Sequence, residues 1–148
     1  MMIAWACNDW GALDRDALYD ILALRERVFV VEQKCAYQEC DGADRDALHL
    51  SGKRDGTLVA YARIFGPGIK HEGAAIGRVI VSAEARGGLG RTLMNEAMAQ
   101  VRAHFGPVPI YVQAQAHLER FYASLGFVRE GDTYDEDGIP HVDMTRPA

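Results

Sequence analysis

A glycine-rich stretch between an apolar run and a helical pattern is the part of this sequence best suited to chemistry. Ile76–Val81 is short and rich in β-branched residues, which predicts a strand. Arg86–Gly90 follows after a short polar link, and a helical pattern begins at once. The first N–H groups of a helix have no internal partner, and the helix dipole favours negative charge there. Because glycines let a ligand approach this bare backbone, the turn predicts a phosphate-binding site.

Two common phosphate-binding motifs do not fit this turn. A P-loop would need lysine where Arg91 stands and glycine where Ala85 stands. The dinucleotide fingerprint would need glycine in place of Leu93. A strand and helix joined by glycines for tight packing, without a ligand, is the remaining structural interpretation.

The motif Gly88-x-Gly90, placed after Arg-Val-Ile-Val, resembles the pyrophosphate loop of the GNAT superfamily of acyl-CoA-dependent N-acyltransferases. The family usually has Arg or Gln where Ala85 stands, whereas Arg86 comes one place later. Either the loop is one residue shorter, or Arg86 takes that role. The resemblance implies that acetyl-CoA is the co-substrate. The positions that it assigns to the co-substrate are Val79, Ile80, Val81, Arg86, Gly87, Gly88, Leu89, Gly90, Arg91, Thr92, Gln115 and Tyr122.

A second motif supports the same resemblance. Tyr122 precedes Gly126-Phe127 by four residues, which is similar to the closing helix of the GNAT family. In that family the tyrosine hydroxyl acts as a general acid for the leaving thiolate, so the resemblance assigns this role to Tyr122. The family often has asparagine where Gln115 stands. A core tyrosine with its hydroxyl near the surface is the alternative.

Longer motifs resemble the ElaA-type branch of the superfamily. These stretches are 24–33, 35–44, 49–50, 114–118 and 136–141. The Leu-Arg-x-x-Val-Phe part of the first stretch also resembles acyl-homoserine-lactone synthases. The resemblance covers about Leu18 to Met144, and it implies a fold and a co-substrate more firmly than an acceptor.

Attack on a thioester requires a neutral amine, so a base or a water relay must remove a proton. Glu39 and His49 are the preferred candidates for the base. The further candidates are Glu32, Asp41, Asp44 and His141. Each of these residues also has an ordinary structural interpretation, such as a solvated loop carboxylate or a half-buried strand histidine. The acidic loop that precedes His49 is further expected to attract a cationic amine.

Composition restricts the class of protein. The 148 residues suit a single domain, here 1–148, and 16 basic against 21 acidic side chains give no basic stripe for nucleic acid. No segment reaches the roughly 18 apolar residues of a membrane span, and the N-terminus does not read as a signal peptide. Three cysteines, Cys7, Cys35 and Cys40, cannot all pair. We therefore expect a cytoplasmic protein without a metal site.

Periodicity predicts an α/β (α+β) fold with a mixed, mostly antiparallel sheet of six to seven strands and helices on both faces. The expected strands are 3–6, 47–52, 57–65, 76–81, 108–114, 127–134 and 139–144. A helix capped by Asp14 or Asp16, a helix from Leu89 and a helix over 115–125 are expected between them.

The sequence therefore predicts an N-acetyltransferase that moves an acetyl group from acetyl-CoA to a primary amine by direct attack. This reaction needs a ternary complex and no covalent enzyme intermediate. The acceptor is expected to be a small molecule or a peptide, and a homodimer is left open. Two alternatives stand beside it: a CoA-binding regulatory or interaction module without turnover, and an acyltransferase like the homoserine-lactone synthases.

Overall fold

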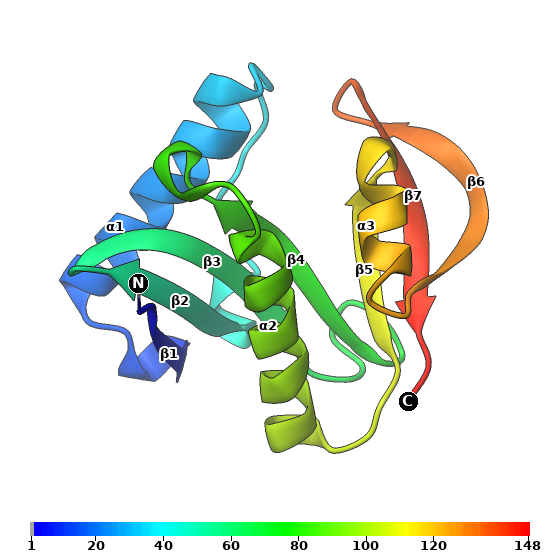
Figure 1. Cartoon of the computed structure of the whole chain (residues 1–148), viewed down its shortest axis with the longest axis horizontal. Helices are drawn as coiled ribbons and strands as arrows, with labels where there is room; N and C mark the ends of the chain where they lie inside the picture. Colours follow the sequence, from blue (N-terminus) through cyan, green and yellow to red (C-terminus); the bar gives the residue numbers. More distant parts are fainter. Residues whose placement is uncertain (1) are drawn as a thin grey trace.

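A computed structural model describes residues 2–148 as one sheet with helices on both of its faces (Figure 1). The sheet has seven strands in the order β1-β2-β3-β4-β5-β7-β6. The strands are β1 (Ala4–Asp9), β2 (Leu48–Arg54), β3 (Thr57–Phe65), β4 (Ala74–Val81), β5 (Ile110–Gln115), β6 (Val128–Glu136) and β7 (Ile139–Arg146). The predicted fold class is confirmed.

Three α-helices and several short helical turns connect these strands. The α-helices are α1 (Arg15–Arg25), α2 (Leu89–Phe105) and α3 (Glu119–Ala123). The π-helix η2 (Glu26–Glu32) continues α1. The short 3-10 turns are η1 (Trp10–Ala12), η3 (Asp44–Asp46), η4 (Ala83–Ala85) and η5 (Ala116–Leu118).

Strands β4 and β5 form the one parallel pair among the described strands, and they barely touch. Only Ala74 with Ile110 and Ala75 with Tyr111 are paired in register. Beyond these residues β4 stays with β3, β5 stays with β7, and the two strands diverge (Figure 1). The sheet is therefore split in its middle, and the split opens toward the carboxyl ends of β4 and β5.

Helices α2 and α1 cover opposite faces of the sheet. On α2, Leu93, Met94, Ala97 and Val101 are buried, as their helical spacing predicts, in a core with Ala60 and other small strand residues. Burying each large side chain stabilises the fold by about 1.5–3 kcal/mol. On α1 the buried residues are Ile21 and Leu24, and together with Val28 of η2 they pack on the other sheet face against Leu58, Tyr61 and Ile80.

The boundaries of several elements differ from the prediction. Asp14 caps α1 by accepting a hydrogen bond from the Ala17 N–H at 2.7 Å, so the first of the two predicted caps is confirmed. Gln115, expected in a helix, instead ends β5 because its pairing with His141 continues the β5–β7 ladder. The helix expected over 115–125 is consequently shorter, with η5 preceding α3.

Candidate functional site

A large cavity occupies the split between β4 and β5. Its volume is about 750 Å³, which lies within the range of small-molecule and cofactor sites. Residues from η2, the following loop, β3, β4, β5, α3 and the β6–β7 turn form its walls. Of the positions predicted to bind the co-substrate, those that line it are Val79, Ile80, Val81, Arg86, Gly90, Gln115 and Tyr122.

A bulge in β4 leaves part of the backbone at this wall unpaired. On β3, Tyr61 pairs with Ile80 whereas Arg63 pairs with Gly77, so the single residue between them faces two residues of β4. Those two residues, Arg78 and Val79, have no partner in the β3–β4 register, and β5 has already diverged. Backbone groups at such a position are free to hydrogen-bond with a bound ligand.

The glycine-rich turn has the conformation that the sequence predicts. Gly87 and Gly88 have φ values of 125° and 95°, which residues with a Cβ rarely adopt. Gly88 caps α2, and no atom lies within 4 Å of the place where its Cβ would be. The first N–H groups of α2 are therefore bare at the edge of the cavity, as an anion requires. The residues present fit the pyrophosphate of a coenzyme A thioester.

Arg86 lies at the same end of the cavity. Its guanidinium donates to Glu32 at 2.9 Å and to the Val81 carbonyl at 3.2 Å, and it remains half-exposed. Arg91 instead turns toward α3 and donates to the Ser124 hydroxyl at 2.7 Å. The predicted positions that lie outside the cavity wall are Gly87, Gly88, Leu89, Arg91 and Thr92.

Tyr122 stands in the wall with its ring held by two neighbours. Phe121 and Phe127 contact it edge-on, with ring centroids 5.1 Å and 5.8 Å away. The residue is 6% exposed, and no side chain or backbone group in residues 2–148 hydrogen-bonds to its hydroxyl. Burial raises the pKa of Tyr122 to about 12. The hydroxyl therefore keeps its proton at neutral pH and is available as a proton donor in the cavity wall.

Glu39 belongs to a buried network of arginines and carboxylates. Its Oε1 accepts from Arg25 at 2.9 Å, and its Oε2 accepts from Arg25 and Arg78. Arg25 is fully buried and also contacts Asp44 at 2.8 Å. Asp44 in turn accepts from Arg63 at 2.9 Å. Since both oxygens of Glu39 are already hydrogen-bonded, this geometry gives no support to its role as the base, which stays a prediction.

His49 is also occupied on both ring nitrogens. Its Nε2 lies 2.9 Å from the Asp44 carbonyl and its Nδ1 lies 2.7 Å from the Tyr61 hydroxyl. A carbonyl only accepts, so Nε2 carries the proton and Nδ1 accepts from Tyr61. His49 is fully buried, is not in the cavity wall, and has its pKa lowered by burial. These contacts connect β2 to β3 and to the first residue of η3, and the catalytic role of His49 stays a prediction that they do not support.

The sequence suggests that the carboxylates of the acidic loop before His49 attract a cationic amine, but three of them are already paired with arginines, whereas Asp46 is exposed. Asp41 accepts from Arg63 at 2.9 Å through both oxygens, and Arg78 lies 3.4 Å away. Burial alone would raise the pKa of Asp41, but the hydrogen bonds from Arg63 outweigh it and hold the pKa well below its usual range. Glu39 and Asp44 are paired in the same way. Because three arginines from other elements neutralise Glu39, Asp41 and Asp44, the attraction of a cationic amine stays a prediction without support from these three carboxylates.

The network was missed by sequence reasoning, although a signal was present. Arg63 and Arg78 each interrupt an otherwise apolar stretch of β3 or β4, and Arg25 directly follows Leu24 on the buried face of α1. A charged side chain on a buried face is uncommon unless it is paired. Arg25 and Arg63 are buried, and Arg78 is 20% exposed. Such interruptions could have indicated a buried ionic cluster, but not its partners.

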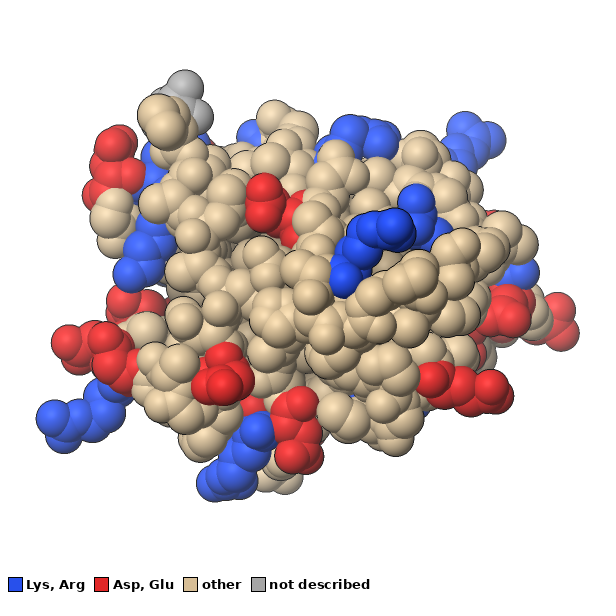
Figure 2. Space-filling model, turned by 90° about the horizontal axis from the view of Figure 1, so that it is seen from below, with Lys and Arg blue, Asp and Glu red and all other residues tan. Residues whose placement is uncertain are grey.

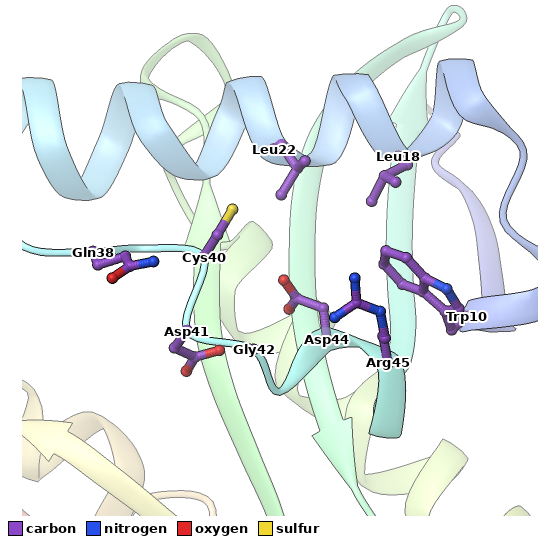
Figure 3. A pocket seen from close by; sticks show the side chains of 9 residues that line it. All are labelled: Trp10, Leu18, Leu22, Gln38, Cys40, Asp41, Gly42, Asp44 and Arg45. Atoms are coloured by element: carbon purple, nitrogen blue, oxygen red, sulfur yellow. The ribbon is translucent and has the colours of Figure 1, made fainter.

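A second, smaller cavity lies on the other side of the loop (Figure 3). Its volume is about 440 Å³, and Leu18 and Leu22 of α1 face it together with Trp10. Gln38 and Asp41 line both cavities. This short part of the loop is therefore the partition between them.

Charge and residue type give little indication of other partners. The face in Figure 2 carries acidic and basic side chains interspersed, without a continuous basic area. Within residues 2–148, no helix has the length and apolar character needed to cross a membrane. No group of three metal-binding side chains occurs in this part of the chain. Cys7, Cys35 and Cys40 are free thiols, and Cys35 donates to the Asp137 carbonyl at 3.0 Å.

A split sheet, a bulged β4 and a glycine turn at the start of α2 are the features of an acyl-CoA-binding transferase. The chain belongs to the acetyltransferase (GNAT) domain family, whose family model matches residues 17–147. It is 45% identical to protein ElaA of Escherichia coli K12 over 148 aligned positions, which cover 98% of this chain and 97% of the relative.

Solved structures agree with this assignment. A crystal structure of an acyl-CoA N-acyltransferase from Pseudomonas aeruginosa superposes with a TM-score of 0.93 at 46% identity, covering 98% of this chain and 99% of that chain. The AHL synthase LasI superposes with a TM-score of 0.76 at 16% identity, covering 97% of this chain and 89% of that chain. The second likeness shows a shared fold alone.

Proposed function

We propose that this protein is an N-acetyltransferase that moves an acetyl group from acetyl-CoA to a primary amine on a small molecule or a peptide. The observation that carries the proposal is the large cavity in the split sheet, because it joins the bare start of α2 to Tyr122. Membership of the GNAT family supports acyl transfer from coenzyme A. The acetyl group and the amine class are the additions made here.

Each end of the cavity has a separate task in the proposed reaction. The N–H groups at Gly88–Gly90 and the guanidinium of Arg86 bind the pyrophosphate. The backbone of Val79–Val81 runs beside the pantetheine arm, and an unpaired N–H there holds the negative charge that develops on the thioester oxygen. Gln115 lies across the split from this strand and contacts Gln33 at 3.4 Å.

Tyr122 is the proposed general acid. The amine nitrogen forms a bond to the acyl carbon, the carbon–sulfur bond breaks, and the thiolate sulfur takes the hydroxyl proton of Tyr122. The proton lost by the amine returns through water to the Tyr122 phenolate oxygen, because Glu39 and His49 are hydrogen-bonded to other groups. No covalent bond to the enzyme is formed.

The cytoplasm is the proposed compartment, and three free cysteines support it. The oligomeric state enters none of these steps, because all the named groups come from one chain.

Two measurements test the proposal in sequence. Acetyl-CoA at about 100 times its dissociation constant should raise the free energy of unfolding by roughly 2.7 kcal/mol. Gly90→Asp should abolish this shift, because its carboxylate would repel the pyrophosphate, and Gly56→Asp at a distant hairpin turn is the control. An unchanged melting temperature of the wild type with saturating acetyl-CoA would contradict the site.

Turnover is measured next with a panel of amines and detection of the released thiol. Longer acyl-CoA donors are compared with acetyl-CoA in the same assay, and a higher kcat/KM for a longer donor would contradict the acetyl assignment. A protein that binds acetyl-CoA but releases no thiol with any amine would instead be a CoA-binding module without turnover.

A further inference from the structure

Arg78 occupies a backbone position that glycine would fill more easily. Its φ is 49°, in the left-handed region that residues with a Cβ seldom adopt. It is the first of the two β4 residues that the bulge leaves unpaired, directly before Val79. Such strained residues persist only where their surroundings fix them. We therefore expect contacts of the Arg78 side chain to stabilise this backbone conformation.

The side chain of Arg78 connects the bulge to the loop that covers it. Its Nε donates to the Glu39 carboxylate, and its Nη2 donates to the Glu39 carbonyl at 3.1 Å. The guanidinium also lies over the rings of Phe29 and Tyr37, 5.9 Å and 5.5 Å from their centroids. One side chain thus joins β4, η2 and the loop that follows η2.

Glu39 is also hydrogen-bonded to a second arginine, Arg25. The guanidinium of Arg25 is fully buried, and its Nε donates to both carboxylate oxygens of Glu39, at 2.9 Å and 3.1 Å. Arg25 is fixed in turn by Asp44. Glu39 is therefore a rigid anchor, whereas Arg78, at 20% exposure, lines the cavity together with Arg63 and Asp41 and is the network residue that belongs to the β4 bulge.

We propose that Arg78 and Glu39 are positioning residues for acyl transfer. Their ion pair holds the β4 bulge in the conformation that leaves the backbone of Val79 unpaired at the cavity wall. An N–H that is fixed in advance stabilises developing negative charge without reorganisation during the reaction. This inference rests on the proposed acyltransferase function, and it gives Glu39 a task other than that of the base.

Arg78→Gly is the central variant, because glycine keeps φ near 49° without strain and removes only the side chain. We expect kcat to fall about 10- to 100-fold, the scale on which a displaced catalytic group matters. The dissociation constant of acetyl-CoA should change less than about twofold, since the pyrophosphate end is untouched. Asp55→Gly is the matched control. Asp55 has a φ of 52° in the β2–β3 turn, outside both cavities, and this variant should retain wild-type kcat.

Glu39→Gln separates positioning from base catalysis. A positioning role predicts that the loss in kcat is equal at all pH values and that Arg78→Gly/Glu39→Gln is no slower than the slower single variant. A general base would give a pH profile that changes shape in Glu39→Gln, while Arg78→Gly stays near wild type. That second pattern, or wild-type kcat in Arg78→Gly, would overturn the proposal.

Amide NMR keeps the test independent of turnover. In Arg78→Gly, the Val79 and Ile80 amide signals should shift or broaden more than those of the β2–β3 turn in Asp55→Gly. Unchanged Val79 and Ile80 signals would overturn the positioning role. If the wild-type protein released no thiol with any amine, the proposed function would fail, and this measurement would still decide whether Arg78 holds the bulge.

Discussion

The two ends of the large cavity differ in the groups that form them: paired, charged side chains at one end and unpaired backbone N–H groups at the other. At the end beside β4, side chains of Arg25, Arg63 and Arg78 hold loop carboxylates in a network that is largely buried. At the end beside α2, glycines present bare backbone, and the ion pair between Arg86 and Glu32 is partly exposed to solvent. The first end is shaped by groups that bind each other, the second by groups left free for a ligand.

This difference predicts whether a substitution at each end reduces folding stability or ligand binding. A buried network has no solvent to replace a missing partner, so a substitution there costs folding stability. Bare backbone at a helix start makes few internal contacts, so a substitution there costs ligand binding. Measuring stability and binding on the same variants therefore tests the comparison directly.

The largest effect is expected for Arg25→Met. Removing this fully buried guanidinium leaves Glu39 and Asp44 short of a partner. We expect the free energy of unfolding in urea to fall by about 3–5 kcal/mol. The control is Arg129→Met, which breaks the exposed Arg129–Glu119 pair and should cost at most about 1 kcal/mol. Similar losses in the two variants would mean that the buried network is not a stability element.

Tyr122→Phe should leave both ends intact and still slow the reaction. The ring keeps its contacts with Phe121 and Phe127, while the proton is lost. We expect kcat to fall about 10²-fold, or roughly 2.7 kcal/mol, with the affinity for acetyl-CoA little changed. Tyr19→Phe, at an exposed position of α1, is the control. Equal kcat for wild type and Tyr122→Phe would leave Tyr122 with a packing role only.

The free energy of unfolding should decrease at acid pH because His49, which contacts Asp44 of the buried network, becomes protonated on unfolding. Burial lowers its pKa, so the folded protein binds fewer protons than the unfolded chain once the pH falls below about 6.5. Stability therefore decreases as the pH falls, with a slope of at most about 1.4 kcal/mol per pH unit from this group. His49→Gln should flatten the curve of unfolding free energy below about pH 6.5. His117→Gln, at an exposed histidine, is the control.

The smallest effect is expected at Arg86. Its guanidinium is 52% exposed, so solvent screens its charge. Arg86→Gln should weaken acetyl-CoA binding by about threefold and should reduce the salt dependence of that binding. Titration calorimetry at two ionic strengths measures both quantities. Unaltered affinity at low salt would show that Arg86 does not take the place of the Arg or Gln that the family usually has one residue earlier.

The parts of the fold that were predicted correctly follow from local patterns. The buried face of α2 repeats at helical spacing, and the β2–β3 hairpin is marked by Asp55-Gly56. The end of β5 was misplaced because the pairing of Gln115 with His141 is set by a strand far along the chain. Local periodicity cannot report such a partner.

Local sequence patterns also predict one end of the candidate site better than the other. The turn that precedes α2 is one short stretch, so its glycines and the following helix could be recognised together. The network is assembled from residues that are far apart in the sequence, namely Arg25, Glu39, Asp41, Asp44, Arg63 and Arg78. The sequence indicates the acidic members of the network but not their pairing, because their arginine partners lie on three other elements.

The narrow junction between β4 and β5 has a consequence for how the chain folds. The strands on each side pair antiparallel with strands close by in the sequence, so hairpins on both sides can form from local contacts. Within residues 2–148, two residue pairs are the only ladder contacts that join the two sides. We expect this junction to form late in folding, when the hydrophobic core closes over it, and its amides to exchange with solvent before those of the hairpins.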